Sequence, residues 1–119
     1  MNQVMRVTLI EDNSDYRTAV QLALEDFADL DLISQFGTSE IAVRTLKESN
    51  EEKLPDIILL DLRLPGMDGL DSIPILRSHA PDAKIIVLTQ SNQEKDVLRA
   101  ISLGAVSYTH LTLPTTPYV

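Results

Sequence analysis

Residues 56–69 read DIILLDLRLPGMDG, and the fold class can be inferred from this stretch. The short, continuously apolar run from Ile57 to Leu60 is typical of a strand covered on both faces, as in a parallel sheet. Asp61 follows directly, and the Pro and Gly residues after it predict a loop. The stretch therefore predicts a central parallel strand that ends in a carboxylate.

Three further segments have the character of strands. They are Val4 to Ile10, Leu30 to Phe36 and Lys84 to Leu88. The first ends in a polar cluster suited to capping a helix, and the second is closed by Gly37. Because helical patterns separate these strands, the chain alternates between strand and helix five times, without a last helix. This alternation predicts an α/β fold with a doubly wound parallel sheet and helices on both faces.

The helices between the strands are predicted from apolar spacing. The first carries a stripe at three- to four-residue intervals, formed by Tyr16, Val20, Ala23 and Phe27. The second is capped by Thr38 or Ser39 and turns an apolar face inward, formed by Ile41, Ala42 and Leu46.

Two later helices are predicted from their end signals. A short helix is expected near Asp71, because Pro74 is tolerated only in a first helical turn. Residues 91–94 form a capping box, and the helix that follows is expected to end at Gly104.

The carboxyl ends of the predicted strands gather acidic side chains. Strand ends place Glu11, Asp12 and Asp61 around one rim of the sheet, together with the hydroxyl of Thr89. Such a cluster should either hold a proton through a raised pKa or bind a hard cation, and Mg²⁺ suits carboxylate and carbonyl oxygens. Asp61 is the best candidate nucleophile toward phosphorus because it ends the most buried strand. Glu11 and Asp12 would hold the ion, and Thr89 would donate its hydroxyl to a phosphoryl oxygen.

Composition excludes several classes of function. The chain has 119 residues, a net charge of -8 and no cysteine. One domain is expected, with neither disulfides nor thiolate metal sites. The negative charge opposes binding to nucleic acid or anionic lipid, and no apolar run approaches membrane-spanning length. We expect a cytoplasmic protein that by itself binds neither DNA nor membrane.

Four motifs together resemble the receiver domains of response regulators. They are LIEDN at residues 9–13, ILLDLRLPGMDG at 58–69, IVLT at 86–89 and the pair at 104–105. The resemblance covers about Val4 through Tyr108, in the style of regulators with a LuxR-like helix-turn-helix output. It implies a flavodoxin-like fold with strand order 2-1-3-4-5. It also implies a sensor histidine kinase as phosphoryl donor and no enzymatic activity of the domain itself.

The resemblance assigns roles to individual residues. Asp61 matches the phosphoacceptor, and Glu11 and Asp12 match the acidic pair that binds the metal. Thr89 matches the switch hydroxyl and Tyr108 the switch aromatic residue. The backbone carbonyl of Arg63 matches the third protein ligand of Mg²⁺.

The end of the chain departs from this family. Leu111 stands where receivers carry a lysine, and the remaining residues oppose the expected fifth helix because they include two prolines. We therefore expect a receiver domain at residues 1–106 and an atypical tail at 107–119 that is a cloning artefact, a truncation scar or a degenerate end. An uncovered apolar face would favour a dimer or higher oligomer, with the tail exchanged between chains.

Two other functions stay open at the level of sequence. A receiver without its lysine could act as an interaction module that needs no phosphorylation. A hydrolase that forms an aspartyl phosphate is disfavoured, because such enzymes usually carry a second aspartate two residues after the nucleophile, where this chain has Arg63. A flavodoxin-like cofactor site is also disfavoured, because residues 11–15 present negative charge to a phosphate.

Overall fold

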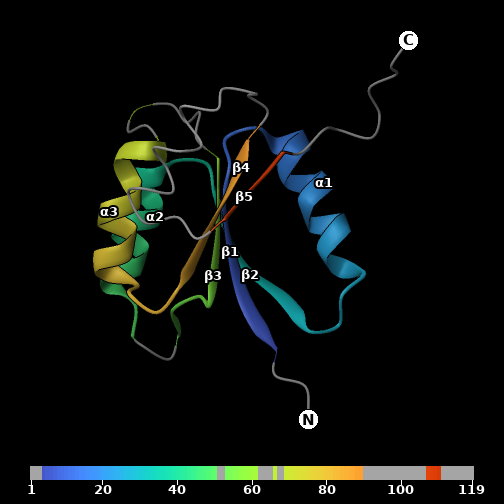
Figure 1. Ribbon diagram of the computed structural model, residues 1–119, viewed down its shortest axis with the longest axis horizontal. Coiled ribbons are helices and arrows are strands. Elements are labelled where there is room, and N and C mark those ends of the chain that lie inside the picture. Colours follow the sequence, from blue (N-terminus) through green and yellow to red (C-terminus); the bar gives the residue numbers. More distant parts are fainter. Residues whose placement is uncertain (1–3, 51–52, 62–65, 67–68, 90–106, 111–119) are drawn as a thin grey trace.

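The computed structural model describes residues 4–50, 53–61, 66, 69–89 and 107–110, without side-chain detail for 89 and 107–110. Strands and helices alternate through most of this range (Figure 1). In chain order the elements are β1 (Met5–Ile10), α1 (Ser14–Glu25), β2 (Leu30–Phe36), α2 (Ser39–Glu48), β3 (Ile57–Asp61), α3 (Gly69–His79), β4 (Lys84–Thr89) and β5 (Ser107–His110).

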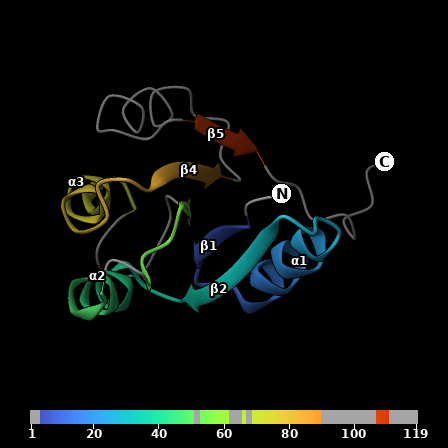
Figure 2. The ribbon, with the colours of Figure 1, turned by 90° about the horizontal axis from the view of Figure 1, so that it is seen from below.

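The strands form one parallel sheet in the order β2-β1-β3-β4-β5. Seen from below in Figure 2, α2 and α3 cover one side of the sheet and α1 covers the other. The predicted doubly wound α/β architecture and its strand order are confirmed. Each of the four strand segments predicted from sequence lies within one residue of the observed strand.

Two apolar cores lie on opposite faces of the sheet. Ile58 and Leu60 of β3 belong to the core under α2 and α3, whereas Leu59 belongs to the core under α1. The run from Ile57 to Leu60 is continuously apolar because successive residues of a strand point to opposite faces, and both faces are covered. β3 is therefore constrained on both faces, and this constraint holds Asp61 at its end in a well-defined position.

A bulge in β2 divides that strand between the two cores. The pairing of β1 with β2 shifts between Val7 and Thr8, so that Ile33 has no partner in the register. Leu30 and Leu32 consequently pack with the α1 core, while Phe36 packs with the α2 and α3 core. Without the extra residue, the strict alternation of side chains would have placed all three on one face.

The predicted apolar stripes of the first two helices are partly wrong. In α1, Tyr16 and Val20 are buried, but Ala23 is exposed and Phe27 is 56% exposed. The helix ends at Glu25, so Phe27 falls outside it, and Leu24 packs against the core instead. A sequence period of three to four residues leaves the choice between positions 23 and 24 open, and packing decides it.

The second helix shows the same kind of error at one position. Ala42 and Leu46 of α2 are buried as predicted. Ile41 is 42% exposed rather than inward, whereas Val43 packs against the core. Thr38 caps this helix, because its side-chain oxygen accepts the backbone N–H of Ile41 at 3.2 Å.

The third helix is longer than the sequence predicted. α3 begins at Gly69 and has 11 residues, so Pro74 lies in its interior rather than in the first turn. Pro74 is exposed while Ile73 and Leu76 are fully buried. Burial of this apolar face compensates for the backbone N–H that the proline lacks.

Several predictions concern residues outside the described part of the chain. The capping box and helix at 91–104 and the segment 111–119 belong to this group. The first four residues of the predicted tail are described, and they form β5, which pairs in parallel with β4.

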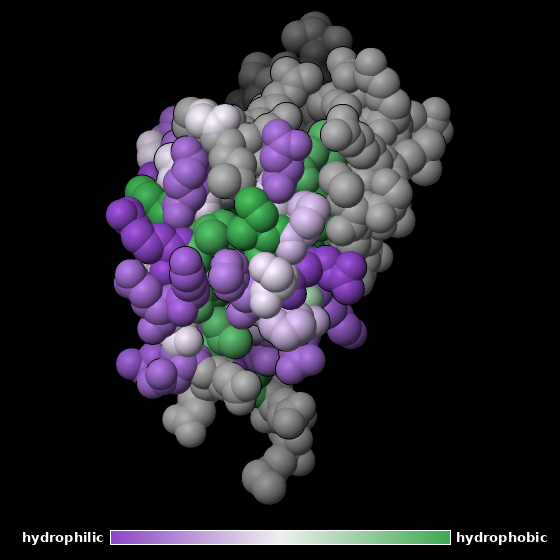
Figure 3. Space-filling model, turned by 90° about the vertical axis from the view of Figure 1, so that its left-hand side faces the viewer, coloured by the Kyte–Doolittle hydropathy of each residue, from purple (hydrophilic) through white to green (hydrophobic). Residues whose placement is uncertain are grey.

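The surface over α2 and α3 is largely hydrophilic, with a smaller apolar area near its centre (Figure 3). Among the described residues, no helix combines the length and apolar character needed to span a bilayer.

Candidate functional site

Three carboxylates meet at the carboxyl end of the sheet. One oxygen of each of Glu11, Asp12 and Asp61 lies within 4.8 Å of the others. Glu11 and Asp12 follow β1, and Asp61 ends the neighbouring strand β3. Glu11 is only 2% exposed and Asp61 9%, whereas Asp12 is exposed. The three acids that the sequence placed on one rim are thus close enough to share one ligand.

The backbone around Glu11 is held on several sides. Its N–H donates to the carbonyl of Phe36 at 2.9 Å, which extends the β1–β2 ladder by one residue. Its carbonyl accepts from the Arg17 guanidinium at 2.7 Å. Its side chain accepts the N–H of Asn13 at 3.3 Å, and Asn13 in turn caps α1. The position of this carboxylate is therefore set by the sheet and by the first helix together.

Burial raises the pKa of Glu11 from its ordinary value of 4.5 to about 8. The largest cause is loss of solvation, followed by the hydrogen bond and the negative charge of Asp61. The N–H of Asn13 acts in the opposite direction. At neutral pH, without a cation, this raised pKa favours the protonated form of the Glu11 carboxyl, next to Asp61. A bound divalent cation would replace this proton.

A change of stability with pH follows from the raised pKa of Glu11. Between about pH 4.5 and pH 8 the unfolded chain has released this proton while the folded chain keeps it, so the contribution to stability falls as pH rises. Relative to Glu11→Gln, the free energy of unfolding should decrease by up to ~1.4 kcal/mol per pH unit in this window. Urea denaturation in EDTA at several pH values measures it. Equal differences at both ends of the window would contradict the prediction.

The remaining predicted site residues are less fully described. Thr89 is the last residue of β4, and Asp61 pairs with its neighbour Leu88. Thr89 therefore ends the strand next to β3, as the sequence predicted. Tyr108 lies in β5, opposite Val87 of β4. Arg63 lies outside the described residues.

Sequence reasoning missed Arg17, although a signal was present. Arg17 is the fourth residue of α1, and a cation near a helix N-terminus is opposed by the helix dipole. Such a residue usually has a specific partner, here the carbonyl of Glu11.

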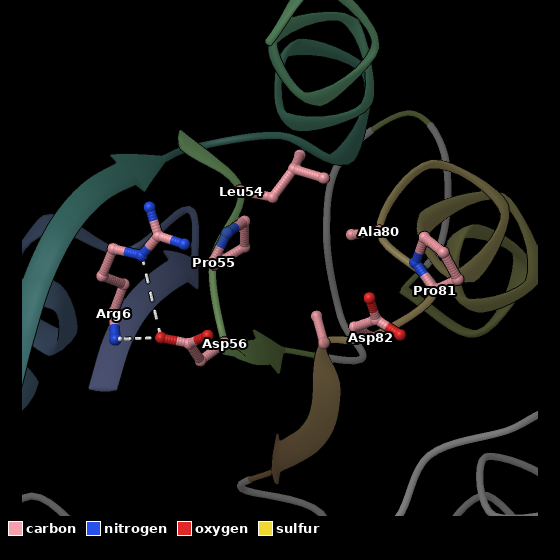
Figure 4. A pocket seen from close by; sticks show the side chains of 8 residues that line it. Arg6, Leu54, Pro55, Asp56, Ala80, Pro81 and Asp82 are labelled. Carbon is pink, nitrogen blue, oxygen red and sulfur yellow. Dashed lines mark hydrogen bonds and ion pairs between the residues drawn. The ribbon is translucent and has the colours of Figure 1, made fainter. Parts of the chain in front are cut away.

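A separate pocket of about 280 Å³ lies at the opposite end of the strands (Figure 4). Arg6 of β1 and Asp56 before β3 form one side of it. The backbone N–H of Arg6 donates to Oδ2 of Asp56 at 2.8 Å, and Nε of Arg6 forms an ion pair with the same oxygen at 3.7 Å. Pro55 and Pro81 line it on the connections that lead into β3 and β4. This pocket is remote from the acidic cluster, and its ion pair ties the amino-terminal ends of β1 and β3.

The acidic cluster has the properties that a hard divalent cation requires. Its donors are carboxylate oxygens, two of the three side chains are buried, and no described cation forms an ion pair with Glu11 or Asp12 within 4.0 Å. Burying several carboxylates together is unfavourable unless protons or a metal ion neutralise them. The raised pKa of Glu11 has the same cause, namely the unfavourable burial of a negative charge beside Asp61. The residues present therefore fit a metal ion with oxygen ligands.

Comparison with known proteins identifies the family. Residues 7–110 match the family described as the response regulator receiver domain. The chain is 35% identical over 102 residues to the nitrate/nitrite response regulator protein NarL of Escherichia coli K12, covering 86% of this chain and 45% of that protein. It is 32% identical over 106 residues to the response regulator GacA of Pseudomonas viridiflava, covering 88% and 47%.

Relatives with other outputs share the same segment. A protein-glutamate methylesterase/protein-glutamine glutaminase of Geobacter sulfurreducens is 33% identical over 104 residues, covering 87% of this chain and 27% of that protein. This chain thus spans less than half the length of these relatives. The similarity to each of these relatives lies in the matched segment, which in this chain corresponds to the receiver domain at residues 7–110.

Solved structures agree with the fold. The receiver domain of the putative response regulator NarL from Mycobacterium tuberculosis superposes with a TM-score of 0.80 at 25% identity, covering 91% of this chain and 84% of that one. A LuxR-family regulator from Aurantimonas gives 0.81 at 24% identity, covering 91% and 74%. Sequence, sheet order and acidic rim all lead to one conclusion: this chain belongs to the response regulator receiver domain family.

Proposed function

We propose that this domain accepts a phosphoryl group on Asp61 with the help of Mg²⁺. The observation that carries the proposal is the convergence of three carboxylate oxygens within 4.8 Å at the end of the central strand. Asp61 is the acceptor because β3 is covered on both faces and holds its last residue in place. Glu11 and Asp12 come from the neighbouring strand end and leave Asp61 as the residue nearest the centre of the sheet.

Glu11, Asp12 and Asp61, together with the backbone carbonyl of Arg63, would hold the ion. When bound, Mg²⁺ supplies positive charge that offsets the negative charge of the carboxylates and of a phosphoryl group. Glu11 must give up its proton before it can serve as a ligand, so metal binding releases a proton near neutral pH.

The donor in this proposal is the phosphohistidine of a sensor histidine kinase. A carboxylate oxygen of Asp61 attacks phosphorus, and the new P–O bond forms as the P–N bond to the imidazole breaks. The electron pair of the P–N bond stays on the imidazole nitrogen. An imidazole ring that is left with a negative charge takes up a proton from solvent, so the histidine leaves with a neutral side chain. The product is an acyl phosphate on Asp61.

Phosphorylation would then shift a conformational equilibrium that already exists in the domain. Thr89 would donate its hydroxyl to a phosphoryl oxygen, and Tyr108 on the adjacent strand would respond to that change. We propose that the output is regulation of transcription, with no catalytic turnover by this domain. We propose that the protein acts in the cytoplasm, where it would meet the sensor histidine kinase.

A phosphate donor of low molecular weight tests the proposal directly. Acetyl phosphate with Mg²⁺ should add the mass of one phosphoryl group, detected by intact-protein mass spectrometry. EDTA should prevent the addition, because the three carboxylates then repel the incoming phosphoryl group. A protein that binds Mg²⁺ by titration but never gains this mass would instead support an interaction module that is independent of phosphorylation, which Leu111 at the lysine position favours.

We propose further that residues 107–119 stand in place of the natural end of the receiver. Leu111 and the two prolines that follow it are the basis for this view. An apolar surface left by a missing fifth helix would then favour dimers or larger oligomers, formed by exchange of the tail. Coding DNA from the source across positions 104–119 tests the first statement, since an unaltered reading frame would refute it. A monomer in light scattering at high concentration would refute the second.

A further inference from the structure

Arg17 connects the first helix to the turn that carries two of the three acids. Its Nη1 donates to the carbonyl oxygen of Glu11 at 2.7 Å, and the side chain is half-buried. A hydrogen bond from a charged group of this length is among the stronger ones in proteins. The bond reaches the backbone of Glu11 and leaves its carboxylate to the acidic cluster.

The carbonyl of Glu11 needs this donor because the sheet diverges there. The N–H of Glu11 donates to Phe36 of β2, and in a parallel ladder the carbonyl of the same residue faces the same neighbour. β2 ends at Phe36, however, and the chain turns at Gly37 toward the cap of α2. A side chain placed on Gly37 would begin 3.8 Å from Nη1 of Arg17, so the guanidinium passes beside this turn. The guanidinium of Arg17 donates the hydrogen bond that a backbone N–H of β2 would donate if that strand continued.

This bond controls the peptide group that links Glu11 to Asp12. Three carboxylate oxygens within 4.8 Å repel one another when no cation is bound, and rotation of that peptide would let them separate. The Arg17 bond opposes the rotation, and the N–H of Asn13 holds the Glu11 carboxylate from the other side. We propose that Arg17 is a positioning residue, which keeps the two acids of the β1–α1 turn gathered with Asp61 before the cation arrives. This inference rests on the proposed function, since it assigns Arg17 a task in metal binding.

Electrostatics alone predicts the opposite effect of removing Arg17. A positive charge beside the cluster repels Mg²⁺, so its loss should strengthen metal binding if Arg17 acts only through its charge. Loss of a group that orients metal ligands weakens metal binding instead, typically by about tenfold or more. The direction of the change therefore separates the two explanations.

The test uses the full chain with Arg17→Met, which keeps the length of the side chain but lacks its donors, and Arg17→Lys, which keeps the charge and one donor group. Mg²⁺ affinity is measured by calorimetric titration of the parent chain and all variants in one buffer at one pH. We expect roughly tenfold weaker binding in Arg17→Met and partial recovery in Arg17→Lys. Arg44→Met, on the exposed face of α2, is the matched control and should bind like the parent chain.

Amide hydrogen exchange gives a second readout that needs no metal. In Arg17→Met the N–H of Glu11 should exchange faster, because its bond to Phe36 loses the neighbouring support. Unchanged or tighter Mg²⁺ binding in Arg17→Met, while the parent chain binds Mg²⁺, would overturn the inference, even if the variant melts at a lower temperature. A parent chain without Mg²⁺ affinity would overturn the proposed metal site. In that case, faster exchange at Glu11 would still show that Arg17 stabilises the β1–α1 turn. Unchanged exchange would refute this stabilising role.

Discussion

Asp61→Asn should abolish formation of the acyl phosphate while leaving the domain folded. The amide has nearly the shape of the carboxylate but lacks a negatively charged oxygen that can attack phosphorus. Asp61 sits at 9% exposure at the end of β3, and the strand beneath it is held by apolar contacts on both faces. The reaction with acetyl phosphate and Mg²⁺ should therefore fall to the background seen in EDTA.

Stability should move in the other direction in the same variant. Asp61 raises the pKa of Glu11 through both a hydrogen bond and its charge. Its neutral replacement removes that repulsion, so Asp61→Asn should unfold at a higher urea concentration than the parent chain above pH 8 in EDTA. A variant that still gains the phosphoryl mass would exclude Asp61 as the acceptor. A variant that is less stable above pH 8 would contradict the repulsion on which the metal site depends.

Among the substitutions proposed for this protein, Ile58→Ala should cause the largest loss of stability. Ile58 is fully buried in the core between β3 and the helices α2 and α3. Removing its side chain leaves a cavity in a strand that has neighbours on both sides, at an expected loss of about 2–5 kcal/mol in the free energy of unfolding. Since small domains are stable by only about 5–15 kcal/mol, this change alone should bring the protein close to unfolding.

Ile33→Ala is the matched control for this variant. Ile33 is the same residue type, also in a strand, but it is 39% exposed and occupies the bulge of β2. Its replacement should reduce stability by well under half as much, measured by urea denaturation of both variants under the same conditions. Comparable losses in the two variants would show that the cores are not arranged as described.

The central strand was predictable from local sequence, and the acidic rim was predictable from local sequence together with the common direction of parallel strands. The run from Ile57 to Leu60 has no polar position, which favours a strand covered on two faces. Parallel strands end at the same edge, which is why acids after β1 and after β3 were expected to meet, and Glu11, Asp12 and Asp61 do meet. The sheet makes β1 and β3 neighbours, and this brings together the acids at the ends of the two strands.

The helix faces were less predictable because neighbouring positions compete for one side of a helix. Ala23 and Leu24 satisfy the same spacing within the error of a 3.6-residue period, and only the position of the sheet selects Leu24. The start of α3 was predicted wrongly at Pro74 for a related reason, because the helix begins at Gly69 and contains the proline in its interior. Burial of Ile73 and Leu76 stabilises the helix around a residue that local propensity would place at its start.

The alternation of strands and helices, the central strand, and the acids that stand at the ends of the first and central strands follow from local sequence, because each depends on residues close together in the chain. Two features follow only from the packing of distant segments. They are the bulge at Ile33, which sends Leu32 and Phe36 to different cores, and the bond from Arg17 to the backbone of Glu11. The physical reason is common to both. A strand that leaves its neighbour changes which groups lack partners, and that divergence is a property of packed elements rather than of any one segment.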